Sequence, residues 1–421
     1  MKIKTKNLSY EKVMALRREK HVKPIKPSIF FRTLIRAVSV FDLAATKFSF
    51  NKKNMDKAGK GPYLILMNHS SFIDLEIAYR IMYPKAMCII CTSDGFVGKS
   101  WLMRMIGCIP TQKFVTDMTL IRDIIYTIKN KNTSILMYPE ASYSFDGTAT
   151  PLPRSLGALV KKLGVPVVNI HTYGAFARQP LYNCLKKRKV KVSADVECLL
   201  SSSEIGEKTT EEIQNILDEA FTFDNFAWQQ NNGIEIIEKD RADGLERILY
   251  KCASCGKEGE MQGRGTEILC RSCGKKYELT KLGRLSSEDG EEFDHIPDWY
   301  AWERDCVKKE LEEGTYSLDT DVEIGLMVNH KAIYMVGSGR LIHNSDGFKL
   351  TGCDGKLNYE QKPLSSYGLY SDYYWYEIGD VICIGNKDCL YYCFPKKDGI
   401  VAKTRIAAEE LYKMVKEKQK V

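Results

Sequence analysis

The chain has 421 residues, 44% of them hydrophobic and 10% aromatic, and a formal net charge of +8. That composition is ordinary for a globular protein, and the length exceeds one ordinary hydrophobic core, so two or three domains are expected. No run of about 18 uncharged apolar residues occurs, which predicts no membrane-spanning helix. The first 29 residues lack the apolar segment of a secretory signal peptide.

The excess positive charge is confined to the N-terminal segment. Residues 1–60 hold 16 Lys and Arg against 4 Asp and Glu, whereas the remainder holds 46 against 50. A basic segment of this kind suits an anionic membrane surface or nucleic acid. A solvated basic leader without a partner is the alternative.

An amphipathic helix is predicted over residues 30–48 of this segment. Apolar side chains recur there at helical spacing, and lysines flank the segment on both sides. Such a helix can lie in a bilayer interface with its basic side chains reaching toward headgroups. It can equally cover a protein core as an ordinary surface helix. We interpret residues 1–60 as a basic, membrane-associating leader and place the protein peripherally at the cytoplasmic face of the cell membrane.

Strand-like and helix-like segments alternate over residues 61–200, and a further helix is expected at 210–219. This rhythm predicts an α/β sheet with helical crossovers, in a domain spanning residues 61–235. The expected strands are 63–67, 86–92, 134–138, 165–171 and 190–200, and the expected helices are 75–82, 120–130 and 155–163.

Three further units are predicted after this domain. A cysteine module occupies residues 245–284, and a helical linker occupies 285–314, with its helix over 297–312. Residues 315–421 carry short strands, among them 332–336 and 381–384, and end in an amphipathic helix with Ile406, Leu411, Met414 and Val415 on one side. Turns are expected at 337–339, 346–347 and 354–355. A β-rich domain closed by a helix is similar in pattern to a pleckstrin-homology shape.

Fourteen cysteines in a chain without a secretory signal indicate a reducing cytoplasm, where thiols are core residues or metal ligands. Cys88 and Cys91 have a redox-like spacing but lie in a strand-like run, which favours buried packing.

His69 follows shortly after the strand-like residues 64–67, and Asp74 lies five positions after His69. On one continuous helix, residues five apart diverge by about 140° around the axis. Their side chains can meet only if a turn intervenes, and Asn68, Ser70 and Ser71 are turn and N-cap residue types. A histidine oriented by a carboxylate is a general base, so the pair predicts an enzyme.

Three later blocks accompany this pair in a fixed order. They are residues 107–113, ending in Lys113; residues 136–142, containing Pro139, Glu140 and Ser142; and residues 164–168. Together the four blocks resemble the bacterial 1-acylglycerol-3-phosphate (lysophosphatidate) acyltransferase family over residues 61–200. The resemblance implies an α/β acyltransferase domain that moves an acyl chain from acyl-CoA or acyl carrier protein to a lipid hydroxyl in phospholipid synthesis.

In that reaction His69 is expected to remove the proton of the acceptor hydroxyl, while Asp74 orients the ring and stabilises the imidazolium. The hydroxyl then attacks the thioester directly. No Gly-x-Ser-x-Gly elbow supports a serine or cysteine nucleophile. Backbone N–H groups near residues 70–72 are candidates for the oxyanion partner.

The acceptor site departs from the family pattern. The third block usually reads Pro-Glu-Gly-Thr-Arg-Ser, and its arginine grips the acceptor phosphate. Here Ala141, Ser142 and Tyr143 stand in place of Gly, Thr and Arg, and Lys113 replaces the arginine of the second block. Lysine is a point charge and tyrosine a neutral hydroxyl, so neither reproduces a bidentate fork. Arg154 or Lys99 is expected to compensate. The substrate-binding set is then Asn68, Lys113, Glu140, Ser142 and Arg154.

Two Cys-x-x-Cys-Gly knuckles, 14 residues apart, form the cysteine module. Their four thiolates have the spacing of a tetrahedral zinc site, and four protein ligands make that site structural. Apart from Tyr250 and Tyr277, its basic side chains lack interleaved aromatics, which favours a solvated face over nucleic-acid binding. The ligands are Cys252, Cys255, Cys270 and Cys273.

Two other functions compete with the acyltransferase. The altered third block supports a zinc-ribbon binding or regulatory protein whose acyltransferase-like domain is non-catalytic, whereas the intact His69 and Asp74 argue against it. A lipid esterase shares the His and Asp chemistry but lacks the nucleophile elbow.

Overall fold

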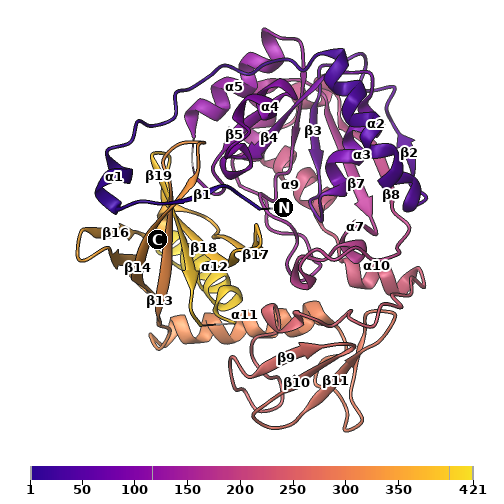
Figure 1. Cartoon of the computed structure of the whole chain (residues 1–421). Helices are drawn as coiled ribbons and strands as arrows, with labels where there is room; N and C mark the ends of the chain where they lie inside the picture. The colour runs from indigo at the N-terminus through magenta and orange to yellow at the C-terminus, as the bar shows by residue number, and fades with distance from the viewer. Residues whose placement is uncertain (1, 116, 398, 420–421) are drawn as a thin grey trace.

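The computed structural model of the chain describes residues 2–115, 117–397 and 399–419 (Figure 1). Met1, in the predicted leader, and residues 420–421, in the predicted C-terminal domain, lie outside these ranges. Strands in these ranges form a seven-stranded, a four-stranded and an eight-stranded sheet. The mixed α/β domain, the cysteine module and the β-rich C-terminal region are therefore all present.

The seven-stranded sheet has the order β2-β8-β7-β3-β6-β4-β5. All neighbouring pairs are parallel except β7 with β8. The four residues of β3 are buried, as an uninterrupted apolar strand in a sheet covered on both faces requires. The strands are β2 (Ser49–Lys53), β3 (Leu64–Met67), β4 (Met87–Thr92), β5 (Cys108–Thr111), β6 (Ser134–Met137), β7 (Val167–Tyr173) and β8 (Ser193–Leu200).

Helices cover the two faces of this sheet with separate cores. Ile65 and Met67 of β3 pack with α2 and α3, whereas the alternating Leu64 and Leu66 pack with α5, α6 and α9. This alternation follows from the two-residue period of a strand. The helices are α2 (Ile29–Ala45), α3 (Ile73–Met82), α5 (Met118–Lys129), α6 (Leu156–Leu163) and α9 (Thr210–Phe221). The predicted strand and helix alternation is confirmed.

Shorter helices connect these elements. They are α1 (Tyr10–Met14), η1 (Ser93–Phe96), α4 (Ser100–Met105), α7 (Ala175–Arg178), η2 (Leu181–Asn183), α8 (Ser202–Glu207), α10 (Asn225–Asn231), η3 (Leu245–Arg247) and η4 (Pro363–Ser365).

The segment predicted as a leader contributes strands to two of the sheets. β1 (Thr5–Asn7) pairs in parallel with β14 of the C-terminal sheet, and β2 pairs with β8. Between them, α2 is the predicted helix, although it ends at Ala45 and Phe48 lies beyond it. Ser39 and Leu43 of α2 are buried against the domain, while Val38 and Phe41 are 68% and 83% exposed. Within the ranges that the structure describes, no helix has the length and apolarity that crossing a membrane requires.

The cysteine module is the antiparallel four-stranded sheet, in the order β12-β11-β10-β9. It packs on α11 (Ile296–Glu312), the predicted linker helix, which lies between this sheet and the C-terminal domain in Figure 1. Trp299 of α11 is fully buried there, and its Nε1 donates to the Lys251 carbonyl at 3.0 Å. The strands are β9 (Met261–Arg264), β10 (Glu267–Cys270), β11 (Lys276–Leu279) and β12 (Leu285–Ser286).

The C-terminal sheet is antiparallel in the order β16-β15-β14-β13-β19-β18-β17, with β1 added beside β14. The chain ends in α12 (Ile400–Lys418). A β-rich region with a C-terminal helix is thus present, and its likeness to a pleckstrin-homology domain stays a prediction. The strands are β13 (Leu318–Met327), β14 (Ile333–Asn344), β15 (Gly347–Gly352), β16 (Leu357–Gln361), β17 (Tyr370–Trp375), β18 (Gly379–Asn386) and β19 (Cys389–Pro395).

One prediction for this region is wrong. Residues 337–339 are not a turn, because they lie inside β14, where the register with β13 shifts between Ile324 and Gly325. Glycine in a strand often marks a β-bulge, and Gly337 has φ 117°. The four residues predicted on one side of α12 do pack in one core cluster, with Ile406 and Leu411 buried and Met414 and Val415 partly buried. The first half of α12 is in addition buried around most of its circumference, including Arg405 and Glu409.

Candidate active site

A short loop between β3 and α3 brings His69 and Asp74 together. The strand ends at Met67, and α3 begins at Ile73, so Asp74 is the second residue of the helix. His69 Nδ1 lies 3.1 Å from Asp74 Oδ2. Because a carboxylate accepts, this contact assigns the proton to Nδ1 and leaves the lone pair on Nε2. The imidazole therefore has the tautomer that a general base needs.

Asp74 is fully buried and is held by the backbone of the same loop. Its Oδ2 accepts from the N–H groups of Ser70 and Ser71 at 2.7 and 3.0 Å. Backbone donors stabilise the ionised carboxylate in this dry setting. The same contacts correct the expectation that the N–H groups of Ser70 and Ser71 face an oxyanion, because both are used by Asp74.

Two tyrosines contact the His69 ring. Its centroid lies 3.9 Å from that of Tyr138 in a stacked arrangement and 4.3 Å from that of Tyr143. Burial lowers the pKa of His69 below its usual 6.5, the Asp74 carboxylate opposes this, and the charge of Lys113 adds to the lowering. The imidazole is therefore neutral at pH 7 and able to accept a proton.

Glu140 connects the His69 loop with the loop that follows β6. Its Oε2 accepts from the backbone N–H of His69 at 3.1 Å, and its Oε1 accepts from that of Thr150 at 2.9 Å. Burial raises the pKa of Glu140 to about 7, and the two backbone hydrogen bonds oppose the rise. Both oxygens are thus engaged with main chain. Beside it, Ala141 has φ 58°, a left-handed conformation that glycine adopts more easily.

The structure uses Asn68 differently from the expectation that it binds substrate. Its Oδ1 accepts from Thr172 N at 2.8 Å, and its Nδ2 donates to Thr172 O at 3.1 Å. The side chain is buried. Because these two bonds pair the amide with the main chain of β7, Asn68 fixes the end of β3 against its neighbouring strand.

Lys113 and Arg154, both expected at the acceptor site, have different surroundings. The Lys113 Nζ lies 4.4 Å from the centroid of the Tyr370 ring, in β17 of the C-terminal domain, and its charge acts on His69. Arg154 instead pairs with Asp218 of α9 at 3.0 Å, and its side chain is 74% exposed. A solvent-exposed pair of this kind is weak, and the expectation that Arg154 compensates for the missing arginine stays a prediction.

Ser142 contacts a residue that sequence reasoning missed. Its Oγ accepts from Arg405 Nη2 of α12 at 3.4 Å. Arg405 is 263 positions away in the chain, and no local pattern links the two. The one local signal is the spacing of Arg405 and Glu409, which stand four apart in α12 and form an ion pair.

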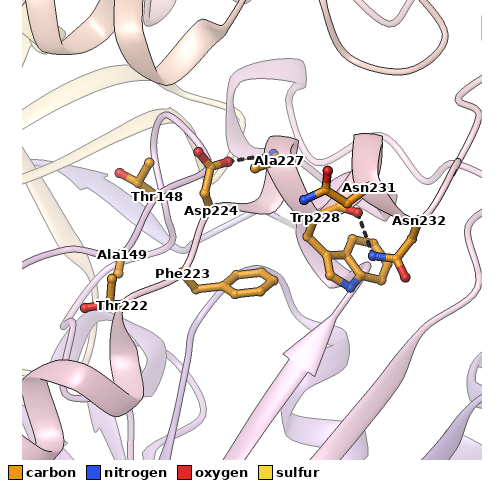
Figure 2. Close-up of a pocket in the computed structure, with 9 residues that line it drawn as sticks. All are labelled: Thr148, Ala149, Thr222, Phe223, Asp224, Ala227, Trp228, Asn231 and Asn232. Carbon is orange, nitrogen blue, oxygen red and sulfur yellow. Dashed lines mark hydrogen bonds between the residues drawn. The ribbon is translucent and has the colours of Figure 1, made fainter.

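An open cavity of about 600 Å³ lies next to the loop that follows Glu140 (Figure 2). Thr148 and Ala149 of that loop form part of its wall, and Phe223 and Trp228 contribute aromatic surface. Its lining includes none of the residues predicted for the site.

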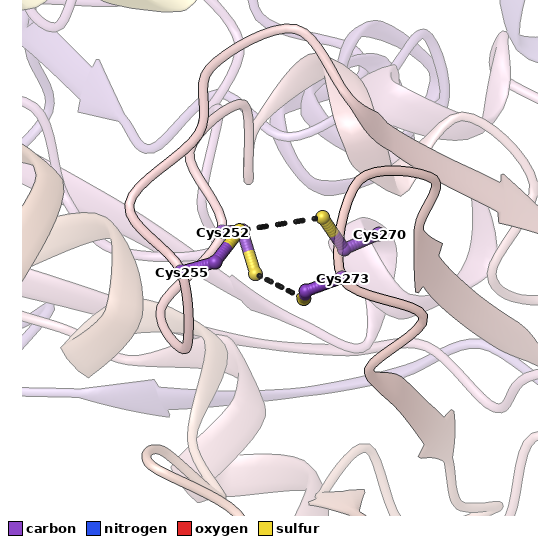
Figure 3. A group of neighbouring side chains, drawn as sticks. All are labelled: Cys252, Cys255, Cys270 and Cys273. Atoms are coloured by element: carbon purple, nitrogen blue, oxygen red, sulfur yellow. Dashed lines mark hydrogen bonds between the residues drawn. The ribbon is translucent and has the colours of Figure 1, made fainter.

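The four predicted cysteines converge in the β9–β12 module (Figure 3). Their sulfur atoms lie within 4.8 Å of one another, with Cys252 and Cys273 at 3.8 Å and Cys255 and Cys270 at 3.7 Å. Four sulfurs bonded to one zinc ion at about 2.3 Å are separated by about 3.8 Å. The cluster can therefore bind a metal ion, and its donor set fits zinc.

Comparison with known proteins defines the class of the first domain. Residues 49–172 match the model of the Acyltransferase family. This part of the chain is similar to that family, and the predicted resemblance is confirmed at that level. The match begins at β2, within the segment that was interpreted as a leader.

Particular relatives are lysophosphatidate acyltransferases. The human (Homo sapiens) protein 1-acyl-sn-glycerol-3-phosphate acyltransferase beta is 26% identical over 129 residues, which are 30% of this chain and 45% of that protein. The chain thus spans about half the length of this relative. Among solved structures, the 1-acyl-sn-glycerophosphate (LPA) acyltransferase PlsC from Thermotoga maritima is 18% identical, with a TM-score of 0.35 over 45% of this chain and 76% of that one.

Proposed function

We propose that the protein transfers a fatty acyl chain from an acyl thioester to the hydroxyl of a lysophospholipid. The contact between His69 Nδ1 and Asp74 Oδ2 carries this proposal, because it leaves Nε2 free of its proton in a domain that matches the Acyltransferase family. The leading acceptor is 1-acylglycerol-3-phosphate, which would give phosphatidate. The name of the human relative supports this acceptor.

The reaction needs no acyl-enzyme. His69 Nε2 takes the proton of the acceptor hydroxyl as its oxygen attacks the thioester carbonyl carbon. Asp74 stabilises the imidazolium that forms, and the burial of the Asp74 carboxylate strengthens this interaction. When the tetrahedral intermediate collapses, the carbon–sulfur bond breaks and the imidazolium returns its proton to the departing thiolate. The products are an ester and a free thiol, on coenzyme A or on acyl carrier protein.

Lys113 is the cation placed to meet an anionic acceptor headgroup. It acts on the His69 ring electrostatically, and its ammonium group lies over the Tyr370 ring. A lysine binds a phosphate as a point charge and imposes little geometry on it. This supports an acceptor with an anionic headgroup and leaves room for lysolipids other than lysophosphatidate.

We further propose a structural zinc ion on the four cysteines and a peripheral position at the cytoplasmic face of the membrane. A Cys₄ site has no open coordination position, so zinc there would stabilise the β9–β12 module and take no part in the reaction. The exposed Val38 and Phe41 of α2, in a segment rich in Lys and Arg, support contact with anionic lipid.

One assay tests the reaction directly. Purified protein is incubated with acyl-CoA or acyl-loaded carrier protein and a panel of lysolipids, and the products are identified by mass. We expect a new diacyl lipid with wild type and none with His69→Ala, while the two proteins have the same circular dichroism spectrum. Absence of product from every donor and acceptor with wild type would favour the non-catalytic binding protein. Release of free fatty acid alone would favour the esterase.

A further inference from the structure

The loop that follows Glu140 is contacted by a side chain from the opposite end of the chain. Arg405 of α12 is 3% exposed. Its Nη2 donates to the hydroxyls of Ser142 and Thr150, each at 3.4 Å, and its guanidinium carbon lies 3.9 Å from the centroid of the Phe145 ring. One planar cation thus contacts both ends and the middle of the loop 142–150.

The same loop holds the backbone of the candidate catalytic histidine. Thr150 N donates to Glu140 Oε1, and Glu140 Oε2 accepts from His69 N. In addition, the Ser144 N–H donates to the His69 carbonyl at 3.0 Å. A displacement of the loop would therefore shift both the backbone N–H and the carbonyl group of His69.

We propose that Arg405 is a positioning residue of the acyl-transfer site, through which the C-terminal domain holds the loop 142–150, Glu140 and the His69 backbone in their reactive arrangement. This inference rests on the proposed acyl transfer and deepens it. The accessory domain would then be a required part of the catalytic unit and not a separate binding module.

The surroundings of Arg405 show that it serves more than its own helix. Its Nε pairs with Glu409 one turn later at 3.1 Å. Its Nη1 is buried and, among the described residues, has no hydrogen-bond partner. Leaving a buried charged donor unpaired is costly, whereas a methionine would fill the space without that cost. The contacts with the loop give a reason for a guanidinium at this position.

Electrostatics add a second effect of Arg405 on Glu140. Burial raises the pKa of Glu140 to about 7, the Asp74 carboxylate raises it further, and the charge of Arg405 lowers it. The two backbone N–H groups also favour the ionised form. Arg405 therefore helps to keep Glu140 an acceptor for both N–H groups near neutral pH.

Other contacts of the C-terminal domain reach the second block. Ser366 Oγ donates to the Phe114 carbonyl at 3.1 Å, and Tyr370 lies under the Lys113 ammonium. The Asp372 carboxyl, in the same strand as Tyr370, interacts with the Lys113 charge. These contacts come from a different element than Arg405, and together with the Arg405–Ser142 contact they place the C-terminal domain against both blocks that depart from the family pattern.

The first test compares the pH profiles of kcat/KM for wild type, Arg405→Lys and Arg405→Met. Loss of the charge raises the Glu140 pKa, so we expect the acidic limb of Arg405→Met to move to higher pH and its plateau to fall about 10- to 100-fold. Arg405→Lys keeps the charge but loses the planar guanidinium. Its acidic limb should therefore stay at the wild-type pH, while its plateau should fall less than that of Arg405→Met. Arg304→Met is the matched control, because Arg304 of α11 pairs with the same Glu409 at 2.9 Å.

The second test is independent of activity. Amide hydrogen exchange of residues 139–150 should become at least about tenfold faster in Arg405→Met than in wild type, and stay at the wild-type rate in Arg304→Met. If Arg405→Met does not fold, the double variant Ser142→Ala/Thr150→Val removes the same contacts from the loop side and should give the same exchange change. Wild-type activity and exchange in these variants would overturn the role of Arg405. If the wild-type protein had no transfer activity, the proposed function would be overturned. The exchange rates would still show whether Arg405 holds the loop 142–150.

Discussion

Glu140 Oε2 accepts the backbone N–H of His69 at 3.1 Å, so a buried carboxylate holds the peptide unit of the candidate general base. Its other oxygen holds Thr150 N. When Glu140 takes up a proton, one oxygen becomes a donor and one of the two backbone N–H groups loses its acceptor. The ionised form is therefore the one that keeps both loops in place.

We predict that this carboxyl sets an acidic limb in the pH profile of kcat/KM near pH 7. Activity should rise as pH increases through the Glu140 pKa of about 7, because ionisation restores both acceptors. The His69 pKa, lowered by burial below 6.5, should affect activity only at lower pH. In Glu140→Gln the limb near pH 7 should vanish and the plateau should fall about 10- to 100-fold.

Glu303→Gln provides the control for this variant. Glu303 is also buried, its pKa is raised by burial, and it accepts from Lys251 N at 2.8 Å in another part of the molecule. It should keep the wild-type profile. A limb near pH 7 that persists in Glu140→Gln would contradict the assignment.

Asp74→Asn should abolish most of the activity without loss of acyl-donor binding. The carboxylate fixes the His69 tautomer and stabilises the imidazolium, and its loss in a serine-protease triad lowers kcat about 10⁴-fold. A decrease of similar size in kcat, with little change in KM for the donor, is expected in steady-state assays. Asp123→Asn is the matched control, since Asp123 forms a second His–Asp contact, with His21 at 3.0 Å. Equal losses in the two variants would indicate damage to the fold and not to the reaction.

The sequence predicted the parts of the site that depend on short separations. His69 and Asp74 are five positions apart, and only a turn between strand and helix lets them meet, which the structure has. The four cysteines form two short knuckles whose spacing defines their convergence. The local backbone determines the first contact and the shape of each knuckle, while the two knuckles meet across separations of 15 and 21 positions.

Contacts between distant segments could not be predicted in this way. Arg405 and Ser142 lie 263 positions apart, and their contact depends on how α12 packs against the first domain. The ion pair of Arg154 with Asp218 of α9, at 3.0 Å, likewise joins residues 64 positions apart. The glycine-rich residues 337–339 indicated a turn, yet pairing of β14 with β13 extends the strand through them. Tertiary packing decided each of these outcomes.

Ala141 gives a prediction about stability. Its φ of 58° costs an alanine about 1–2 kcal/mol relative to glycine. Ala141→Gly should therefore raise the free energy of unfolding of the acyltransferase domain by about 1 kcal/mol, partly offset by the greater entropy of the unfolded chain. Urea denaturation followed by circular dichroism measures it.

A matched substitution with the opposite sign is Gly164→Ala. Gly164 ends α6 with φ 64°, and an added Cβ would meet nothing within 4 Å, so the change tests backbone strain alone. It should lower stability by about 1 kcal/mol. Stabilisation by both variants, or by neither, would contradict the argument from left-handed strain.

The cysteine cluster predicts one zinc ion per chain. Elemental analysis of the purified protein should give a ratio near one, and Cys273→Ser should lower both the zinc content and the thermal stability of the β9–β12 module. Cys306→Ser, in α11 outside the cluster, should leave both unchanged. Because the proposed metal is structural, a chelator should inactivate the enzyme only as fast as the module unfolds. Immediate inhibition with the fold intact would point to a metal in the reaction.

The exposed apolar side of α2 predicts binding to anionic membranes. Phe30 and Phe41 are 66% and 83% exposed, in a segment whose basic residues outnumber its acidic ones. Full burial of a phenylalanine contributes about 1.5–3 kcal/mol, so Phe30→Gln and Phe41→Gln should each weaken binding to anionic phospholipid vesicles about tenfold in cosedimentation. Ile237→Gln changes a residue that is 60% exposed outside α2 and should bind as wild type does. Binding should also weaken with salt, because screening reduces the attraction of the lysines and arginines to the lipid. If Phe30→Gln and Phe41→Gln bound the vesicles as strongly as Ile237→Gln, contact through α2 would be excluded. Acyl transfer measured with dispersed lysolipid would be unaffected by that result.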